Sequence, residues 1–207
     1  MQYYLVLDLE MTGFEPGWHE IIQIGACLFD ENWQEKGRFL QNVYPENEEA
    51  FSLYAEKVHG LSQADLDDAP MMHEVIPELE EWILEKLGWR GRFEDRHTYF
   101  RKFRDILLCG QGVVNDINFL KFAYRQEKID WPFSYRMLDL QSLSFLLFRI
   151  LEANGQTVPR AFGLDAVAAF FGYEREGQAH NALEDAVITA QCLKSVLAYT
   201  QKLKLST

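Results

Sequence analysis

Residues 4–13 read YLVLDLEMTG, an apolar run interrupted by two carboxylates. The run predicts a buried β-strand over residues 3–9. Side chains two positions apart leave the same face of a strand, so Asp8 and Glu10 share one face. A buried carboxylate is unfavourable unless it is paired, protonated or bound to a metal. The pattern D-x-E-x-T-G favours a metal site here, and the alternative is a strand that emerges into solvent at Asp8.

The C-terminal segment, residues 179–203, has apolar residues at helical spacing. His180 should lie at or just before the first turn of this helix, with Asp185 about one and a half turns further along the chain. A histidine beside a carboxylate suits proton transfer next to a metal ion. A solvated capping residue is the alternative for His180, and Glu184 is the alternative ligand to Asp185.

A fourth acid follows an apolar stretch in the middle of the chain. Residues 106–124, ILLCGQGVVNDINFLKFAY, predict a strand that leads into an amphipathic helix. Asn115 or Asp116 near this junction would be an ordinary N-cap. The apolar residues three and four positions after Asp116 instead favour a helix seated on the sheet, with the carboxylate of Asp116 facing the strand ends.

Taken together, D-L-E-M-T-G, N-D-x-x-F-L and H-x-A-x-x-D resemble the motifs of the DEDDh branch of the 3′–5′ exonucleases. This branch includes proofreading subunits, RNase T and oligoribonucleases. The resemblance runs from Tyr3 to about Ala198 and also covers EIIQIGACLFD and VHGLS. The middle motif departs from many relatives, because Gln111, Gly112 and Asn115 stand where a His-Asn pair and a Phe are usual. DLEMTG is typical of oligoribonucleases, but the rest of the chain does not follow that subgroup.

The resemblance implies a ribonuclease-H-like fold and a two-metal-ion mechanism. Two Mg²⁺ or Mn²⁺ ions would be held by four carboxylates, Asp8, Glu10, Asp116 and Asp185. His180 would take the proton of the attacking water, and the products would be nucleoside 5′-monophosphates released from a 3′ end. By the same resemblance, the terminal nucleotide would be received by Met11, Thr12, His59 and Leu61.

The chain reads as one domain over residues 1–207. Strands near residues 3–9, 20–30 and 36–44, followed by alternating helices and strands, predict an α/β fold with a mixed central sheet and helices on both faces. Residues 78–85 are expected to form the solvated side of a helix.

A basic and aromatic insertion interrupts this pattern at about residues 88–105. Its core, residues 90–104, reads RGRFEDRHTYFRKFR. Basic residues interleaved with rings are typical of surfaces that guide a single strand. Alternatively, the rings pack on the body of the protein and the arginines are solvated.

The formal net charge of −12 opposes a long nucleic-acid footprint, since phosphate affinity comes from Lys and Arg. We therefore expect local binding of a single-stranded 3′ end, of DNA or of RNA. The three cysteines lie far apart in apolar segments and favour a reduced, cytoplasmic protein. No segment is apolar enough to predict a membrane partner, and a homodimer or a larger complex is possible. The rival function is a catalytically inactive nucleic-acid-binding or scaffold protein of the same fold.

Overall fold

The computed structural model describes residues 2–92, 96–174 and 181–202. The strands are β1 (Tyr3–Met11), β2 (Ile21–Phe29), β3 (Glu35–Asn42), β4 (Ile106–Gly110) and β5 (Met137–Asp139). The helices are α1 (Leu53–His59), α2 (Met72–Lys86), α3 (Arg96–Phe103), α4 (Val114–Gln126), α5 (Leu140–Ala153), α6 (Leu164–Phe171) and α7 (Ala182–Thr200). Two short 3-10 helices, η1 (Glu48–Ala50) and η2 (Gln63–Asp65), flank α1.

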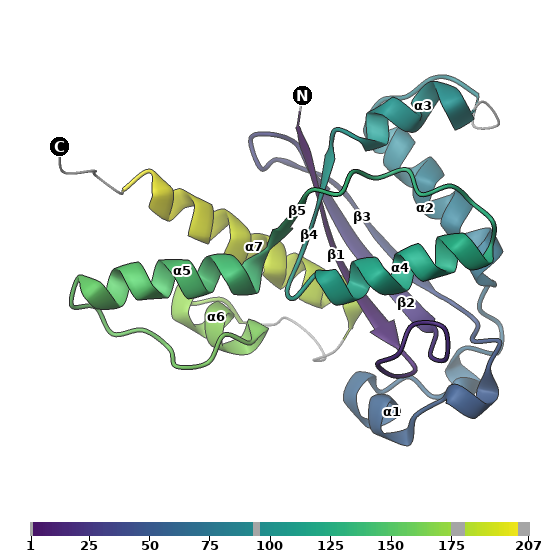
Figure 1. Ribbon diagram of the computed structural model, residues 1–207, viewed down its shortest axis with the longest axis horizontal. Coiled ribbons are helices and arrows are strands. Elements are labelled where there is room, and N and C mark those ends of the chain that lie inside the picture. Colours follow the sequence, from purple (N-terminus) through teal and green to yellow (C-terminus); the bar gives the residue numbers. More distant parts are fainter. Residues whose placement is uncertain (1, 93–95, 175–180, 203–207) are drawn as a thin grey trace.

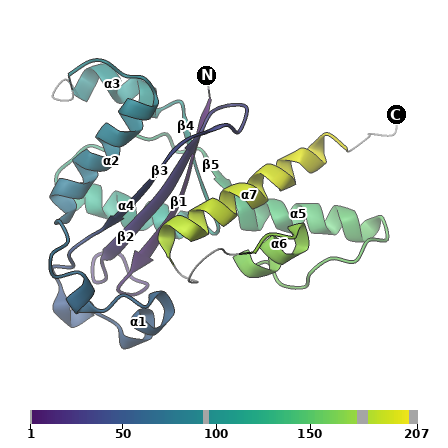
Figure 2. The ribbon, with the colours of Figure 1, turned by 180° about the vertical axis from the view of Figure 1, so that it is seen from behind.

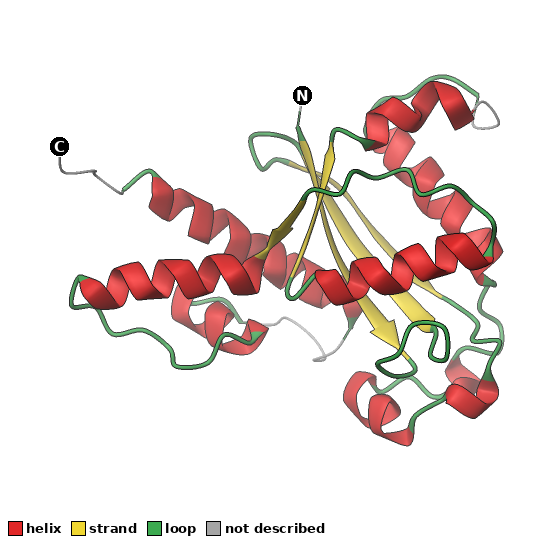
Figure 3. Ribbon diagram, in the orientation of Figure 1, coloured by secondary structure: helices red, strands yellow, loops and turns green. Residues whose placement is uncertain are grey.

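The five strands form one mixed sheet in the order β3-β2-β1-β4-β5. The chain first makes an antiparallel meander, because the connections between β1, β2 and β3 are too short for a crossover helix. Strands β4 and β5 then add parallel to β1, each after a helical segment. Figure 3 shows the helices packed against both faces of this sheet, so the predicted fold class is confirmed.

Alternation along β1 divides the core between the two faces. Leu5, Leu7 and Leu9 pack with residues of α2, α3 and α4, whereas Val6 packs with residues of α5, α6 and α7. Figures 1 and 2 show these two layers from opposite sides, with α4 in front of the sheet in one view and α7 in front in the other. The even-numbered side chains of β1, which include both acids, therefore belong to the α7 face.

Helix α7 begins very close to β2. A Cβ atom at Gly25 would overlap the backbone of Ala182, so only glycine lets the first turn of α7 approach this strand. The Oε1 atom of Gln23 accepts a hydrogen bond of 2.9 Å from the backbone N–H of Ala182. Strand β2 thus fixes where α7 starts, and with it the place of Asp185 beside the acids of β1.

The insertion packs through its rings. Tyr99 and Phe103 are 1% and 0% exposed, and they are four residues apart on the inner side of α3. The hydroxyl of Tyr99 donates a hydrogen bond of 3.1 Å to Oε2 of Glu80. Glu80 is fully buried under α3, so the prediction that residues 78–85 form a solvated side is wrong at this position. For Tyr99 and Phe103 the structure agrees with the packing interpretation.

In the part of the chain that the structure describes, no helix is both long enough and apolar enough to cross a bilayer.

Candidate active site

Three of the predicted metal ligands meet at the end of β1. Asp8, Glu10 and Asp185 each offer a carboxylate oxygen, and these oxygens lie within 4.8 Å of one another. Glu10 and Asp185 are 8% and 6% exposed, and Asp8 is partly exposed. Oxygen ligands at this separation suit hard divalent cations such as Mg²⁺ and Mn²⁺. Residues separated by more than 170 positions in the sequence therefore form one oxygen-rich site.

The fourth acid, Asp116, adjoins this cluster through the backbone of β1. Its Oδ1 atom accepts a hydrogen bond of 3.2 Å from the N–H of Leu9, the residue between Asp8 and Glu10. Asp116 is not the N-cap of α4. That position belongs to Val113, and Asp116 lies in the first turn. Neither Asn115 nor Asp116 therefore caps the helix, and the carboxylate of Asp116 faces the strand as the second interpretation expected.

The surroundings of Asp116 are short of positive charge. Burial raises the pKa of its carboxyl from 3.8 to about 7, although hydrogen bonds from the backbone N–H groups of Asp116 and Leu9 oppose the rise. The charge of Asp139 makes a smaller contribution to the same rise in pKa. A cation bound beside these acids would stabilise the ionised carboxylate and reverse the shift. The site thus has the donor atoms and the electrostatic need for a metal ion.

Asp139, which the sequence analysis did not single out, positions the turn before α4. Its Oδ1 atom accepts hydrogen bonds from the backbone N–H groups of Gly112 at 2.7 Å and Val113 at 3.3 Å. Its Oδ2 atom accepts from the N–H of Ser142 at 3.0 Å and so caps α5. Gly112 has a φ of +63°, a conformation that favours glycine. The capping pattern D-x-x-S was the available signal, but only the fold shows that it also holds the turn that carries Asp116.

The N-terminus of α7 carries Asp185. Asn181 is the N-cap, and its side-chain oxygen accepts from the N–H groups of Leu183 and Glu184 at 3.2 Å each. The partial positive charge of a helix N-terminus favours a carboxylate in the first turn. The carboxylate cluster includes Asp185 and not Glu184. The predicted general base, His180, lies outside the described residues.

The four predicted substrate contacts, Met11, Thr12, His59 and Leu61, differ in exposure. Thr12 is 0% exposed, and its backbone donates to the carbonyl of Glu20 at 2.9 Å and accepts from the N–H of Ser52 at 3.1 Å. His59 is 5% exposed, and its Nδ1 atom accepts from the N–H of Leu61 at 3.0 Å. Met11 and Leu61 are partly exposed. Thr12 and His59 thus organise the loops, while substrate contact by this group of residues stays a prediction.

Exposed apolar side chains stand beside these loops. Phe14 and Tyr54 are 74% and 65% exposed, and their ring centroids are 6.4 Å apart. Leu53, next to Tyr54 in the first turn of α1, is 73% exposed. The hydrogen bond from Ser52 to Thr12 fixes α1 at the end of β1. The sequence could not identify this surface, since apolar residues at a loop and a helix start usually indicate core.

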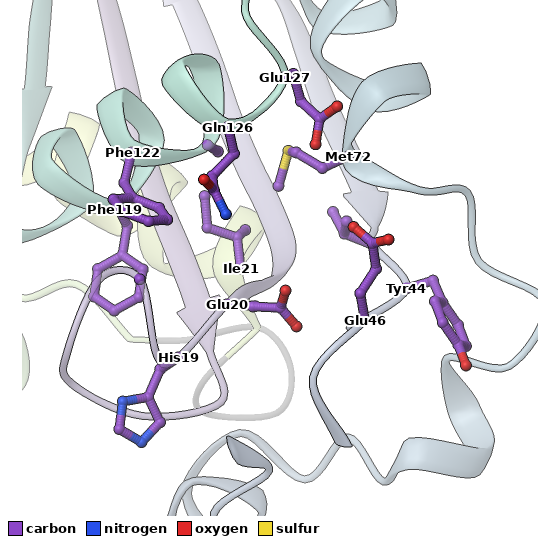
Figure 4. A pocket seen from close by; sticks show the side chains of 13 residues that line it. His19, Glu20, Ile21, Tyr44, Glu46, Met72, Phe119, Phe122, Gln126 and Glu127 are labelled. Atoms are coloured by element: carbon purple, nitrogen blue, oxygen red, sulfur yellow. The ribbon is translucent and has the colours of Figure 1, made fainter. Parts of the chain in front are cut away.

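A separate hollow lies between the β1–β2 connection, α4 and the chain before α2. Figure 4 shows the carboxylates of Glu20, Glu46 and Glu127 around it, together with the ring of Phe122. Its volume is about 560 Å³, including the part open to solvent. Among the described residues that line it, none belongs to the carboxylate cluster. The hollow is therefore distinct from the carboxylate cluster.

Comparisons with known proteins agree with this geometry. A family model described as "Exonuclease" matches residues 5–90. The DNA polymerase III subunit epsilon of Rickettsia felis is 25% identical over 189 residues, which cover 90% of this chain and 70% of that protein. The nuclease domain of 3′hExo, a DEDDh family member bound to rAMP, superposes with a TM-score of 0.72 at 20% identity, covering 100% of this chain and 96% of that one. An Escherichia coli ExoI–ssDNA complex gives a TM-score of 0.75 at 17% identity, covering 98% of this chain and 41% of that one.

Proposed function

We propose that this chain releases nucleoside 5′-monophosphates from the 3′ ends of single-stranded nucleic acid. The premise is that it belongs to the DEDDh-type 3′–5′ exonucleases of the ribonuclease-H-like superfamily. The observation that carries the proposal is the convergence of Asp8, Glu10 and Asp185 within 4.8 Å. Asp116, joined to the same strand at Leu9, completes the set of four acids.

Mg²⁺ or Mn²⁺ fits this set, because the donors are carboxylate oxygens and burial leaves Asp116 with a raised pKa. Asp8, Glu10, Asp116 and Asp185 would hold the two ions. When bound, the ions supply charge stabilisation for the attacking and leaving oxygens of an in-line displacement. The chain contributes the fixed geometry. The carboxylate of Asp116 accepts a hydrogen bond from the backbone of β1, and the start of α7, which carries Asp185, is held by the side chains of Gln23 and Asn181.

His180 completes the proposal as the general base. The spacing of five residues between His180 and Asp185 is that of the histidine branch of the family. An imidazole near its ordinary pKa can accept a proton from water at neutral pH. The division of roles is that the four acids hold metal while His180 moves the proton.

The substrate class follows from the exposed rings beside the site. Phe14 and Tyr54 present ring faces to solvent at the end of β1. Stacking of a base on a ring requires an unpaired base and tolerates any sequence. A frayed or single-stranded 3′ end therefore fits better than a closed duplex. The ring pair does not distinguish DNA from RNA, because both present the same bases.

The proposed setting is the cytoplasm. Cys27, Cys109 and Cys192 are all free and buried. Burial raises the pKa of Cys27 and of Cys192 to about 12, so these thiols stay protonated and unreactive. Assembly into a homodimer or a larger complex stays a prediction, to which the similarity to a polymerase subunit adds support.

The test is digestion of short DNA and RNA oligonucleotides of matched sequence, labelled at the 5′ end, with Mn²⁺ or with a chelator. We expect a ladder of products shortened from the 3′ end, release of 5′-monophosphates, and no products with the chelator. An inactive scaffold of the same fold would bind the oligonucleotides without shortening them. Products that arise from internal cuts, or cleavage that persists in chelator, would contradict the proposal.

A further inference from the structure

The basic residues of this acidic chain are concentrated in one stretch. Residues 90–136 contain ten Lys or Arg and six Asp or Glu, so this stretch carries +4 while the whole chain carries −12. The remaining 160 residues therefore carry −16. Charge segregation of this size creates a local field opposite in sign to that of the molecule as a whole.

The fold gathers this stretch into one continuous surface. A row of rings joins α4 to α3 through the segment 127–136. The ring centroids of Tyr124 and Trp131 are 5.2 Å apart, those of Trp131 and Phe133 5.1 Å, and those of Phe133 and Phe103 5.2 Å. Because these rings pack inward, the polar residues beside them are carried to the outside of α4, the segment and α3.

Six exposed cations lie on this surface, which we call the basic face: Arg101, Lys102, Arg104, Lys121, Arg125 and Arg136. Lys121 and Arg125 are four residues apart on α4 and so point to the same side. Nη2 of Arg136 donates to the carbonyl of Arg104 at 3.1 Å, which brings the end of α3 to the start of β5. Within the described residues, no ion pair joins any of the six to a carboxylate.

The basic face begins on α4, the helix that carries Asp116, and ends at the far end of the sheet. Asp116, in the first turn of α4, precedes Lys121 by five residues, or about 7.5 Å of helix. At the other end, the carbonyl of Asp105 accepts from the N–H of Tyr3, where β1 begins. The seven steps from Tyr3 to Glu10 span about 23 Å. Figure 1 shows α3 at the end of the sheet opposite α1.

We propose that the basic face holds the phosphate backbone of the substrate strand upstream of its 3′ end. The inference rests on the proposed function, which supplies the polyanion. Only strands long enough to cover this span of about 23 Å reach Arg101 and Arg104. The rings of Tyr99 and Phe103 are buried, so contact there is through charge and independent of sequence.

The acidic hollow beside α4 restricts this path. Phe122, Gln126 and Glu127 turn toward the hollow, where Glu20 and Glu46 also lie. A phosphate backbone laid over three carboxylates would be repelled. Arg125 lies over the ring of Phe122, 4.8 Å from its centroid, and so borders the hollow. Lys121 lies over Trp131, 5.5 Å from its centroid, so the favourable route away from the carboxylate cluster follows Lys121 and the segment 127–136.

The experiment compares single strands of about 4 and about 24 nucleotides, because only the longer one spans the face. The test variant is Arg101→Gln/Arg104→Gln. The matched control, Lys194→Gln/Lys202→Gln, removes two exposed cations from α7 and the turn after it.

For the parent chain we expect a lower KM on the long strand than on the short strand. The test variant should lose this advantage, and the salt slope of log KM should fall by about 1.4, at about 0.7 per phosphate contact. Its kcat, and its KM on the short strand, should stay within about twofold of the parent values.

Cleavage of the short strand by the parent chain reports separately on the proposed function. If that cleavage occurs but the long strand has no KM advantage, the basic face does not hold the substrate. The inference is equally overturned if the control variant lowers the salt slope as much as the test variant, or if the test variant retains the full slope. The last result would assign the face to another anionic partner, such as an acidic protein.

Discussion

Charged side chains are buried at the carboxyl end of β1 and exposed near its amino end. At its carboxyl end, Glu10 and Asp185 are almost completely buried within 4.8 Å of each other and of Asp8. Near its amino end, Arg101 on α3 and Arg104 just after α3 are exposed, whereas Tyr99 and Phe103 of α3 are buried. Taking a charge out of water costs several kcal/mol, whereas an exposed charge costs little and is screened by salt. The acids can therefore act only at short range on a bound metal ion, while the arginines act at longer range on any polyanion.

The largest effect is expected from Asp8→Asn at the buried end. The change removes a proposed metal ligand and relieves repulsion between carboxylates, so cleavage should be abolished while the metal-free protein is as stable as the parent or more so. Thermal unfolding with Mn²⁺ provides the measurement. At about 100 times its Kd, the metal should stabilise the parent chain by about 2.7 kcal/mol, and this gain should be lost in the variant.

His180→Ala is the comparison variant for that experiment. It should lower kcat by roughly 10²–10⁴-fold, as expected for loss of a general base, while the stabilisation by Mn²⁺ survives. Loss of the metal effect in His180→Ala would make His180 a ligand. Normal turnover by Asp8→Asn would contradict the assignment of these acids as the ligands of a catalytic metal ion.

At the other end of β1, Phe103→Ala should affect stability and spare the chemistry. Phe103 is 0% exposed and holds α3 against the core, so its truncation should lower the free energy of unfolding by about 3–5 kcal/mol. Urea unfolding measures this loss, and kcat on a short strand should stay close to that of the parent. Phe14→Ala is the matched control, because Phe14 is 74% exposed and its truncation should change stability by less than about 0.5 kcal/mol. Equal losses in the two variants would contradict the burial of α3.

A pH dependence of stability sharpens the contrast between buried and exposed charge. The pKa of Asp116 is about 7 in the folded protein and ordinarily 3.8, so the folded state holds the extra proton between these pH values. The contribution of Asp116 to metal-free stability should therefore fall as pH rises from about 4 to about 7. Comparing the parent chain with Asp116→Asn isolates this slope, because the amide oxygen can still accept from Leu9. A difference that is flat in pH would show that Asp116 is ionised throughout.

Local sequence patterns were sufficient to predict the strands and the helix that carry the acids. The apolar run before Asp8, the alternation that puts Asp8 and Glu10 on one face, and the helical spacing that places Asp185 near a helix start are all properties of neighbouring residues. Periods of 2 and 3.6 residues encode such features directly. The strands expected near residues 3–9, 20–30 and 36–44 are observed as β1, β2 and β3.

The positions and burial of the remaining residues depend on contacts between distant parts of the chain. Asp116 looks like a helix cap in the sequence, but it bonds to Leu9, 107 residues away. Asp139 holds the turn before α4 from 27 residues further along the chain, and the buried Glu80 accepts a hydrogen bond from Tyr99 of α3. Whether a ring packs or remains exposed, as Phe103 and Phe14 do, depends on what lies above it. Burial is a property of the assembled fold, so these assignments belonged to the tertiary structure.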